Sequence, residues 1–209
     1  MKTSDVYERA WWKEKRQYIV GIDEAGRGPL AGPLVVAAVM FPKGYEHEEI
    51  YDSKKISEAK RIRLFKEIIN QAYEYHILII EPAIIDELNI YRATQKAMQD
   101  LCDMFKHVDG VLSDAMPLPN CQQEVMPLIK GDQKSVSIAA ASILAKVTRD
   151  AIMKGYDVLY PQYGFANHKG YPTKRHKEAL EKYGIIKGLY RHSYAPVQAV
   201  EQMHLDLGK

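Results

Sequence analysis

Two nearly continuous apolar runs stand close together near the beginning of the chain. They cover residues 18–22 and 34–41, and strands buried on both faces of a sheet typically show such unbroken apolar runs. Shorter runs at 76–80 and 110–113 predict two further strands, and 124–129 is a weaker candidate. The pattern therefore predicts a sheet that begins with two closely connected, buried strands.

Helical periodicity fills the intervals between these runs. Ser57 is placed to cap a helix whose inner face is predicted to consist of Phe65, Ile68, Ile69 and Ala72. A second helix is expected over 91–105, with Ala97, Met98, Leu101, Cys102 and Phe105 inside, and Ser135 precedes an alanine-rich helix over 136–153. A short helix within 5–15 would pack its two tryptophans onto the body.

The order of these elements predicts an α/β fold. Strand-strand-helix-strand-helix-strand-strand-helix favours a mixed central sheet with helices on both faces, in which the first two strands form an antiparallel pair. We expect a catalytic domain over 1–154, opened by a short helical segment at 1–17. A basic helical extension over 155–209 would contact nucleic acid.

The composition limits the class of protein and its cellular setting. Of the 209 residues, 46% are hydrophobic and 27% are charged, and no apolar run approaches the ~20 residues that cross a bilayer. Cys102 and Cys121 fit neither a metal spacing nor a disulfide framework, which favours a reducing, cytoplasmic setting. We expect a monomer without membrane association, and no segment indicates a protein partner.

Charge is unevenly distributed along the chain. Residues 154–193 hold eight Lys or Arg against three Asp or Glu, a net +5, and the whole chain carries +2, so the rest is about −3. A basic C-terminal third favours a polyanionic partner, although a solvated helical surface has the same composition.

Four acids follow predicted strands. Asp23 and Glu24 come directly after the first run, Asp114 after the fourth and Asp132 after the fifth. Sites in sheets with parallel strands gather at strand ends, and an all-carboxylate site suits Mg²⁺ or Mn²⁺ better than zinc. Two such ions can drive phosphodiester hydrolysis. The alternative is that these acids, Asp132 above all, are solvated turn residues.

The glycine-rich turn after Glu24 also matches two nucleotide-binding patterns. Residues 26–31 fit G-x-G-x-x-G/A, which requires a helix to open there, but Pro29, Pro33 and the valines at 35 and 36 indicate a strand. Residues 21–26 fit G-x-x-x-x-G without the Lys and Ser/Thr of a P-loop. A dinucleotide-dependent oxidoreductase is thus a poor alternative.

A set of ordered motifs resembles the ribonuclease HII family. The blocks are G-I-D-E-A-G-R-G-P-L-A-G-P at 21–33, D-S-K-K at 52–55, S-D-A at 113–115, K-G-D at 130–132, A-A-A-S-I-L-A-K-V-T-R-D at 139–150 and H-K-G-Y-P-T at 168–173. They span 18–196 without large gaps. The G-R-G loop and the short segment before the first strand favour ribonuclease HII over the related ribonuclease HIII.

The resemblance implies a ribonuclease H-like fold and a metal-dependent endonuclease. Its substrates would be RNA–DNA hybrids and duplex DNA with embedded ribonucleotides, cut on the 5′ side of the ribonucleotide to leave a 5′-phosphate. The implied ligands of Mn²⁺ or Mg²⁺ are Asp23, Glu24, Asp114 and Asp132. The implied substrate contacts are Gly26, Arg27 and Gly28 at the ribose 2′-hydroxyl, Tyr171 on the sugar, and Lys54, Lys146 and Lys174 at phosphates.

Some positions are left open by these motifs. Ser113 stands where the family more often has an apolar residue. Asp150 is either a fifth acid near the site or part of an ion pair on a helix. His168, His176 and His192 lack metal-ligand spacing, and we expect them at the surface. A non-catalytic nucleic-acid-binding module that keeps this fold is the alternative function.

Overall fold

The computed structural model describes residues 5–206, so the parts of the predicted terminal segments at 1–4 and 207–209 lie outside the described residues. Packing separates two compact units. The first comprises the residues up to Ala25, Val35–Leu78 and Thr94–Val147, and the second comprises Gly26–Leu34, Ile79–Ala93 and the residues from Thr148 on. The functional division predicted at residue 154 stays a prediction.

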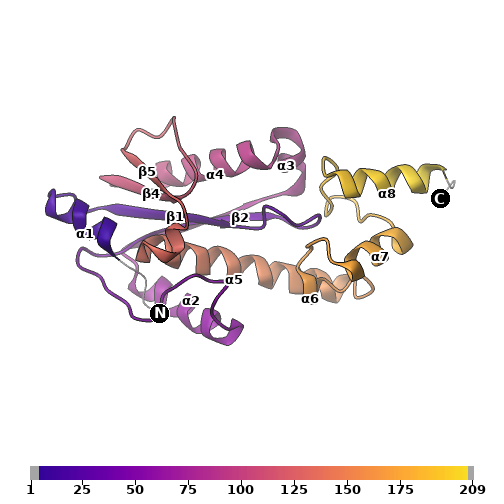
Figure 1. The fold of residues 1–209 in the computed structure, drawn as a ribbon, viewed down its shortest axis with the longest axis horizontal. Coiled ribbons are helices and arrows are strands. Elements are labelled where there is room, and N and C mark those ends of the chain that lie inside the picture. Colours follow the sequence, from indigo (N-terminus) through magenta and orange to yellow (C-terminus); the bar gives the residue numbers. More distant parts are fainter. Residues whose placement is uncertain (1–4, 207–209) are drawn as a thin grey trace. The chain divides into compact units, whose positions relative to one another are not determined.

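The described residues form a mixed five-stranded sheet (Figure 1). In the order β3-β2-β1-β4-β5, the strands are β3 (Glu74–Ile80), β2 (Leu34–Met40), β1 (Ile19–Ala25), β4 (Gly110–Asp114) and β5 (Val125–Leu128). β1 is antiparallel to β2 and parallel to β4, which is parallel to β5. The predicted mixed sheet and its antiparallel first pair are confirmed.

Helices flank this sheet, as predicted. They are α1 (Val6–Lys13), α2 (Glu58–Gln71), α4 (Ile90–Met104) and α5 (Val136–Leu159), and a 3₁₀ turn, η1 (Gly131–Gln133), precedes α5. Figure 1 shows α4 on one side of the sheet and α2 and α5 on the other. Ser57 caps α2 by accepting a hydrogen bond from the Lys60 backbone N–H at 3.3 Å. The inner residues predicted for α4 are buried.

The inner face of α2 differs from its prediction. Leu64 and Ile68 are the buried residues, whereas Phe65 and Ile69 are only half-buried. The apolar stripe includes both sets of residues, and the edge that contains Leu64 is the one that is buried. Periodicity located the helix correctly and its buried face only approximately.

The start of α5 is held by contacts from α1 and β1. Trp11 and Trp12 pack with Ile19 in a buried cluster, as expected. The buried Glu8 carboxylate accepts hydrogen bonds from the Ser135 hydroxyl at 2.5 Å and the Ser137 backbone N–H at 3.1 Å. A Cβ atom at Gly21 of β1 would fall 2.3 Å from the backbone of Ser137. The two backbones therefore touch, and only glycine fits.

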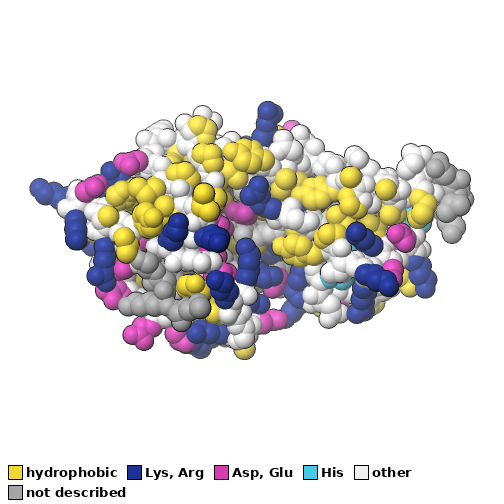
Figure 2. Space-filling model, in the orientation of Figure 1, with side chains coloured by type: hydrophobic (Ala, Val, Ile, Leu, Met, Phe, Trp, Pro, Cys, Tyr) yellow, Lys and Arg dark blue, Asp and Glu magenta, His cyan; other side chains and the backbone are white. Residues whose placement is uncertain are grey.

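The second unit is mainly helical. It contains α3 (Pro82–Leu88), α6 (Phe165–His168), α7 (Lys174–Tyr183) and α8 (Ala195–Asp206). Phe165, Tyr163 and Tyr190 are buried in its core. Sequence analysis predicted no helix between residues 80 and 91 and so missed α3, which begins at Pro82, although proline is favoured in the first turn of a helix. Figure 2 shows Lys and Arg side chains over α7 on the visible face, with acidic side chains among them.

No helix within residues 5–206 combines the length and the apolar character needed to cross a membrane.

Candidate active site

The predicted acids gather where the parallel strands of the first unit end. Asp23 lies in β1 and Asp114 is the last residue of β4, and the register pairs Ile22 with Ser113, the residue before each acid. Asp132 follows β5, the next parallel strand, within η1. Glu24 adjoins Asp23 near the end of β1. We call Asp23, Glu24, Asp114 and Asp132 the acidic cluster.

Asp23 is the most deeply buried member, with 5% of its surface exposed. Its Oδ1 atom accepts a hydrogen bond from the Glu24 backbone N–H at 2.7 Å, and its carboxylate accepts another from the Ser142 hydroxyl. Burial, then the charges of Glu24 and Asp114, raise the pKa of Asp23 well above its ordinary value. Ser142 also shares a 2.8 Å hydrogen bond with the Ser53 hydroxyl.

Asp114 and Asp132 are connected through the turn after β5. The Gly131 backbone N–H donates to Oδ1 of Asp114 at 2.8 Å, which ties the turn to the end of β4. Burial, followed by the charges of Asp52 and Asp114, raises the pKa of Asp132 to about 6. The carboxylates therefore act on one another across neighbouring strands.

The D-S-K-K loop adds a cation and a further acid. Burial opposes the charge of Lys54 more than any other single cause, but the charges of Asp23, Asp132, Asp52 and Asp114 together raise its pKa. The Lys54 ammonium group thus faces the acidic cluster as a counter-charge. Asp52 is buried and coupled to Asp132, and sequence analysis assigned it no role.

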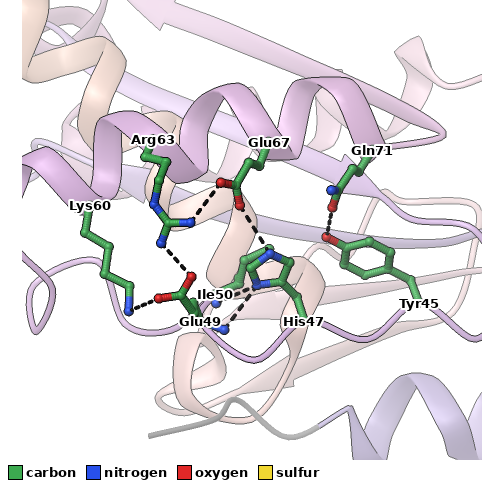
Figure 3. Close-up of polar contacts among 8 residues, drawn as sticks. All are labelled: Tyr45, His47, Glu49, Ile50, Lys60, Arg63, Glu67 and Gln71. Atoms are coloured by element: carbon green, nitrogen blue, oxygen red, sulfur yellow. Dashed lines mark hydrogen bonds and ion pairs between the residues drawn. The ribbon is translucent and has the colours of Figure 1, made fainter.

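A polar network holds the chain before this loop against α2 (Figure 3). The Nδ1 atom of His47 accepts hydrogen bonds from the backbone N–H of Glu49, at 3.1 Å, and from that of the following residue. Its Nε2 atom lies 3.3 Å from Glu67 and must carry the proton, because Nδ1 is an acceptor. The Glu49 carboxylate pairs with Lys60 at 2.9 Å and Arg63 at 2.6 Å.

The acidic cluster fits a hard divalent cation by its chemistry. All its donors are carboxylate oxygens, and a bound cation would counteract the burial and the repulsion between carboxylates that raise the pKa values of Asp23 and Asp132. Among the side chains of the described residues, no three or more Asp, Glu, His or Cys are arranged to hold a metal ion together. The fit therefore rests on donor chemistry and charge, without a preformed coordination geometry.

Ser113, the departure from the expected motif, has a local explanation. It is buried, and its hydroxyl donates to the Met116 carbonyl at 2.6 Å in the turn after β4. The hydroxyl is satisfied within its own turn, and Asp114 keeps its place at the strand end.

The glycine-rich turn belongs to the second unit and leads into β2. No helix opens there in the described structure, so the dinucleotide-binding alternative is wrong. Gly26 has φ +106°, and a Cβ atom there would lie 2.2 Å from Arg149. Arg27 and Gly28 are exposed, and a Cβ atom at Gly28 would sit 3.4 Å from the ring of Tyr171.

Two buried histidines lie next to Tyr171. The rings of His168 and His176 stack at 4.3 Å between centroids. Nδ1 of His176 donates to the Tyr171 carbonyl at 2.9 Å, and Nε2 accepts from the Tyr190 hydroxyl at 2.8 Å. Burial lowers the pKa of His176 to about 4, so it is neutral. The expected surface positions of His168 and His176 are wrong, whereas His192 is exposed.

The remaining predicted residues lie in different surroundings. Lys146 is half-buried on α5 in the first unit, and Lys174 is exposed at the start of α7 with Glu178 at 3.9 Å. Asp150 is buried in the second unit, and both interpretations of it stay predictions. Both lysines stay predictions as phosphate contacts.

Comparison with known proteins identifies the family. Residues 20–197 match the model of "Ribonuclease HII". The chain is 50% identical over 195 residues to the ribonuclease HII of Clostridioides difficile strain 630, covering 93% of this chain and 76% of that protein. It is 52% identical over 180 residues to that of Ruminiclostridium cellulolyticum, covering 86% and 71%.

A solved structure agrees with these relatives. The ribonuclease H2 of Pyrococcus horikoshii superimposes with a TM-score of 0.75 at 25% identity, covering 89% of this chain and 98% of that one. Ribonucleases of this type are hydrolases that act on RNA–DNA hybrids and generally depend on metal ions. Sequence, fold and the order of the acids along the strands agree, and the chain belongs to the ribonuclease HII family.

Proposed function

We propose that this protein is an endonuclease that cuts the RNA strand of RNA–DNA hybrids and cuts on the 5′ side of ribonucleotides embedded in duplex DNA. The observation that carries the proposal is the position of Asp23, Asp114 and Asp132 at or just after the ends of neighbouring parallel strands, where the charge of Asp114 acts on both other carboxylates. Family membership supports hydrolysis of RNA–DNA hybrids.

The acidic cluster would hold two divalent cations, Mg²⁺ or Mn²⁺. When bound, these ions supply the positive charge that activates the attacking water and stabilises the leaving oxygen. Ser142 orients the Asp23 carboxylate, and the Gly131 N–H orients that of Asp114. The charges of the acids hold the pKa of Lys54 above its ordinary value despite burial, and its ammonium group can contact a substrate phosphate.

The turn at residues 26–28 and Tyr171 would recognise the ribose. The 2′-hydroxyl is the local group that distinguishes RNA from DNA, and glycines let a backbone approach it closely. Gly28 lies beside the exposed Tyr171 ring, which offers a flat apolar face to a sugar. Glu24 and Gly26 are two residues apart, so metal binding and sugar recognition are adjacent along the chain.

The test is hydrolysis of a DNA duplex with one ribonucleotide, in Mn²⁺ or Mg²⁺. The expected product is a single cut on the 5′ side of the ribonucleotide, leaving a 5′-phosphate and a 3′-hydroxyl. Asp23→Asn should abolish cleavage, and Asp100→Asn, an exposed acid paired with Lys96, should not change it. Binding without metal-dependent cleavage by the wild type would instead indicate a non-catalytic module.

A further inference from the structure

A fully buried arginine donates hydrogen bonds to backbone carbonyls of the glycine-rich turn within the second unit. Arg191 is 0% exposed. Its guanidinium donates to the carbonyl oxygens of Gly26 at 2.6 Å, Arg27 at 3.0 Å and Gly32 at 2.9 and 3.2 Å. A further N–H donates to the Tyr194 hydroxyl at 3.0 Å. All five donors of the guanidinium are therefore used, four of them on the turn.

Tyr194 completes this arrangement. Its hydroxyl accepts from Arg191 and donates to the Arg27 carbonyl at 2.6 Å, so that carbonyl is held from two sides. The Tyr194 ring also lies against the guanidinium, 5.3 Å from its centroid. Arg191 and Tyr194 together form what we call the carbonyl lock.

The lock fixes the direction of two peptide groups. In a trans peptide, the N–H points away from the C=O of the same peptide plane. Drawing the Gly26 and Arg27 carbonyls onto the buried Arg191 therefore turns the N–H groups of Arg27 and Gly28 to the opposite side. Arg27 and Gly28 are exposed, and Gly28 adjoins the Tyr171 ring.

The buried charge of Arg191 is compensated by the turn itself. Burial lowers the pKa of Arg191, which means that the buried charge costs folding free energy. Asp86, an acid whose charge reaches Arg191, accepts hydrogen bonds from the backbone N–H groups of His192 and Ser193. The guanidinium is thus held by backbone carbonyls of one short turn, and these carbonyls would lose their donors if an apolar side chain replaced Arg191.

We propose that Arg191 and Tyr194 are positioning residues for ribose recognition, because they aim the N–H groups of Arg27 and Gly28 at the 2′-hydroxyl. This inference rests on the proposed function. It assigns discrimination between ribose and deoxyribose to two side chains more than 160 residues away from the turn.

The experiment measures the ratio of two dissociation constants in Ca²⁺ or without metal. One duplex carries a single ribonucleotide, and the other is the same sequence in DNA throughout. Tyr194→Phe removes the hydroxyl and keeps the ring. It should lower the preference for the ribonucleotide about tenfold, because the net free energy of one good hydrogen bond corresponds to about that factor. Affinity for the DNA duplex should stay unchanged. Arg191→Lys, which cannot span the three carbonyls, should lower the preference further.

Tyr163→Phe is the matched control. Its hydroxyl donates to backbone carbonyls of the same unit, Gly184 at 2.8 Å and Tyr183 at 3.3 Å, away from the turn. An unchanged preference in Tyr194→Phe, or an equal loss in Tyr163→Phe, overturns the inference. If Arg191→Lys does not fold, Tyr194→Phe decides. A wild type without ribose preference or cleavage refutes the proposed function itself, which separates the two failures.

Discussion

Replacing Asp132 by asparagine should make the metal-free protein more stable while destroying its activity. Burial, followed by the charges of Asp52 and Asp114, raises the pKa of the Asp132 carboxyl group from 3.8 to about 6. At ~1.36 kcal/mol for each pKa unit, ionised Asp132 costs the folded state about 3 kcal/mol at neutral pH. Solvent screening and the amide left behind reduce the expected gain to roughly 1–2 kcal/mol.

The sign of the pH dependence follows from the direction of the shift. The folded state binds the Asp132 proton more tightly than the unfolded state, so the cost is absent below about pH 4. It develops as the pH rises towards 6 and is complete above that. The stability gain of Asp132→Asn at pH 5 should therefore be about half of its gain at pH 8.

The assay is thermal or urea unfolding in a chelator at both pH values. For a chain of this size, the gain corresponds to roughly 3–6 °C in melting temperature at pH 8. Added Mn²⁺ should raise the melting temperature of the wild type more than that of the variant, because the metal uses the carboxylate. Destabilisation at pH 8, or equal gains at both pH values, would refute the reasoning.

Asp109→Asn provides a control of opposite sign. Its carboxylate accepts hydrogen bonds from the backbone N–H groups of Tyr18 and Gln17, which lower its pKa. The stabilisation from this acid is present above its unfolded pKa and is lost as the pH falls through its folded pKa. Asp109→Asn should therefore lose stability at pH 8, and the loss should shrink in acid.

Three further predictions test the site and its scaffold. Tyr171→Ala should lower kcat/KM on an embedded ribonucleotide roughly 10–100-fold, whereas Tyr171→Phe should keep most activity, since stacking needs only the ring; equal losses would contradict this. Glu8→Ala should cost about 1–2 kcal/mol in urea unfolding by removing the acceptor of Ser135 and Ser137, and Glu8→Gln should cost less. Gly21→Ala should cost at least ~3 kcal/mol, because its Cβ would overlap α5, and a wild-type melting temperature would disprove that contact.

The sequence predicted what depends on local pattern. The strands are runs of apolar residues, the caps at Ser57 and Ser135 precede their helices, and Asp23, Asp114 and Asp132 follow strands that prove to be parallel neighbours. These features are encoded within a few residues of where they act, so pattern and motif sufficed.

The features that sequence analysis missed depend on distant contacts. Arg191 holds Gly26 across 165 residues, and nothing around Arg191 in the sequence indicates burial of a charge. His176 becomes a core residue because the Tyr171 carbonyl and the Tyr190 hydroxyl satisfy both of its ring nitrogens. A polar residue is buried only where the fold supplies its partners, and those partners are invisible in a local window.

Because of the two buried arginines of the second unit, we expect ionic strength to affect the shape of the glycine-rich turn and the binding of nucleic acid differently. Arg191 and Arg149 bond to backbone carbonyls, such as that of Pro33 at 2.9 Å from Arg149, and these dipoles carry no net charge for salt to screen. Contacts between surface lysines and phosphates weaken steeply as salt displaces the polyanion. A rising salt concentration should therefore weaken the binding of nucleic acid while the turn keeps its shape. The preference for a duplex with a ribonucleotide over the DNA duplex should then persist at salt concentrations that lower both affinities.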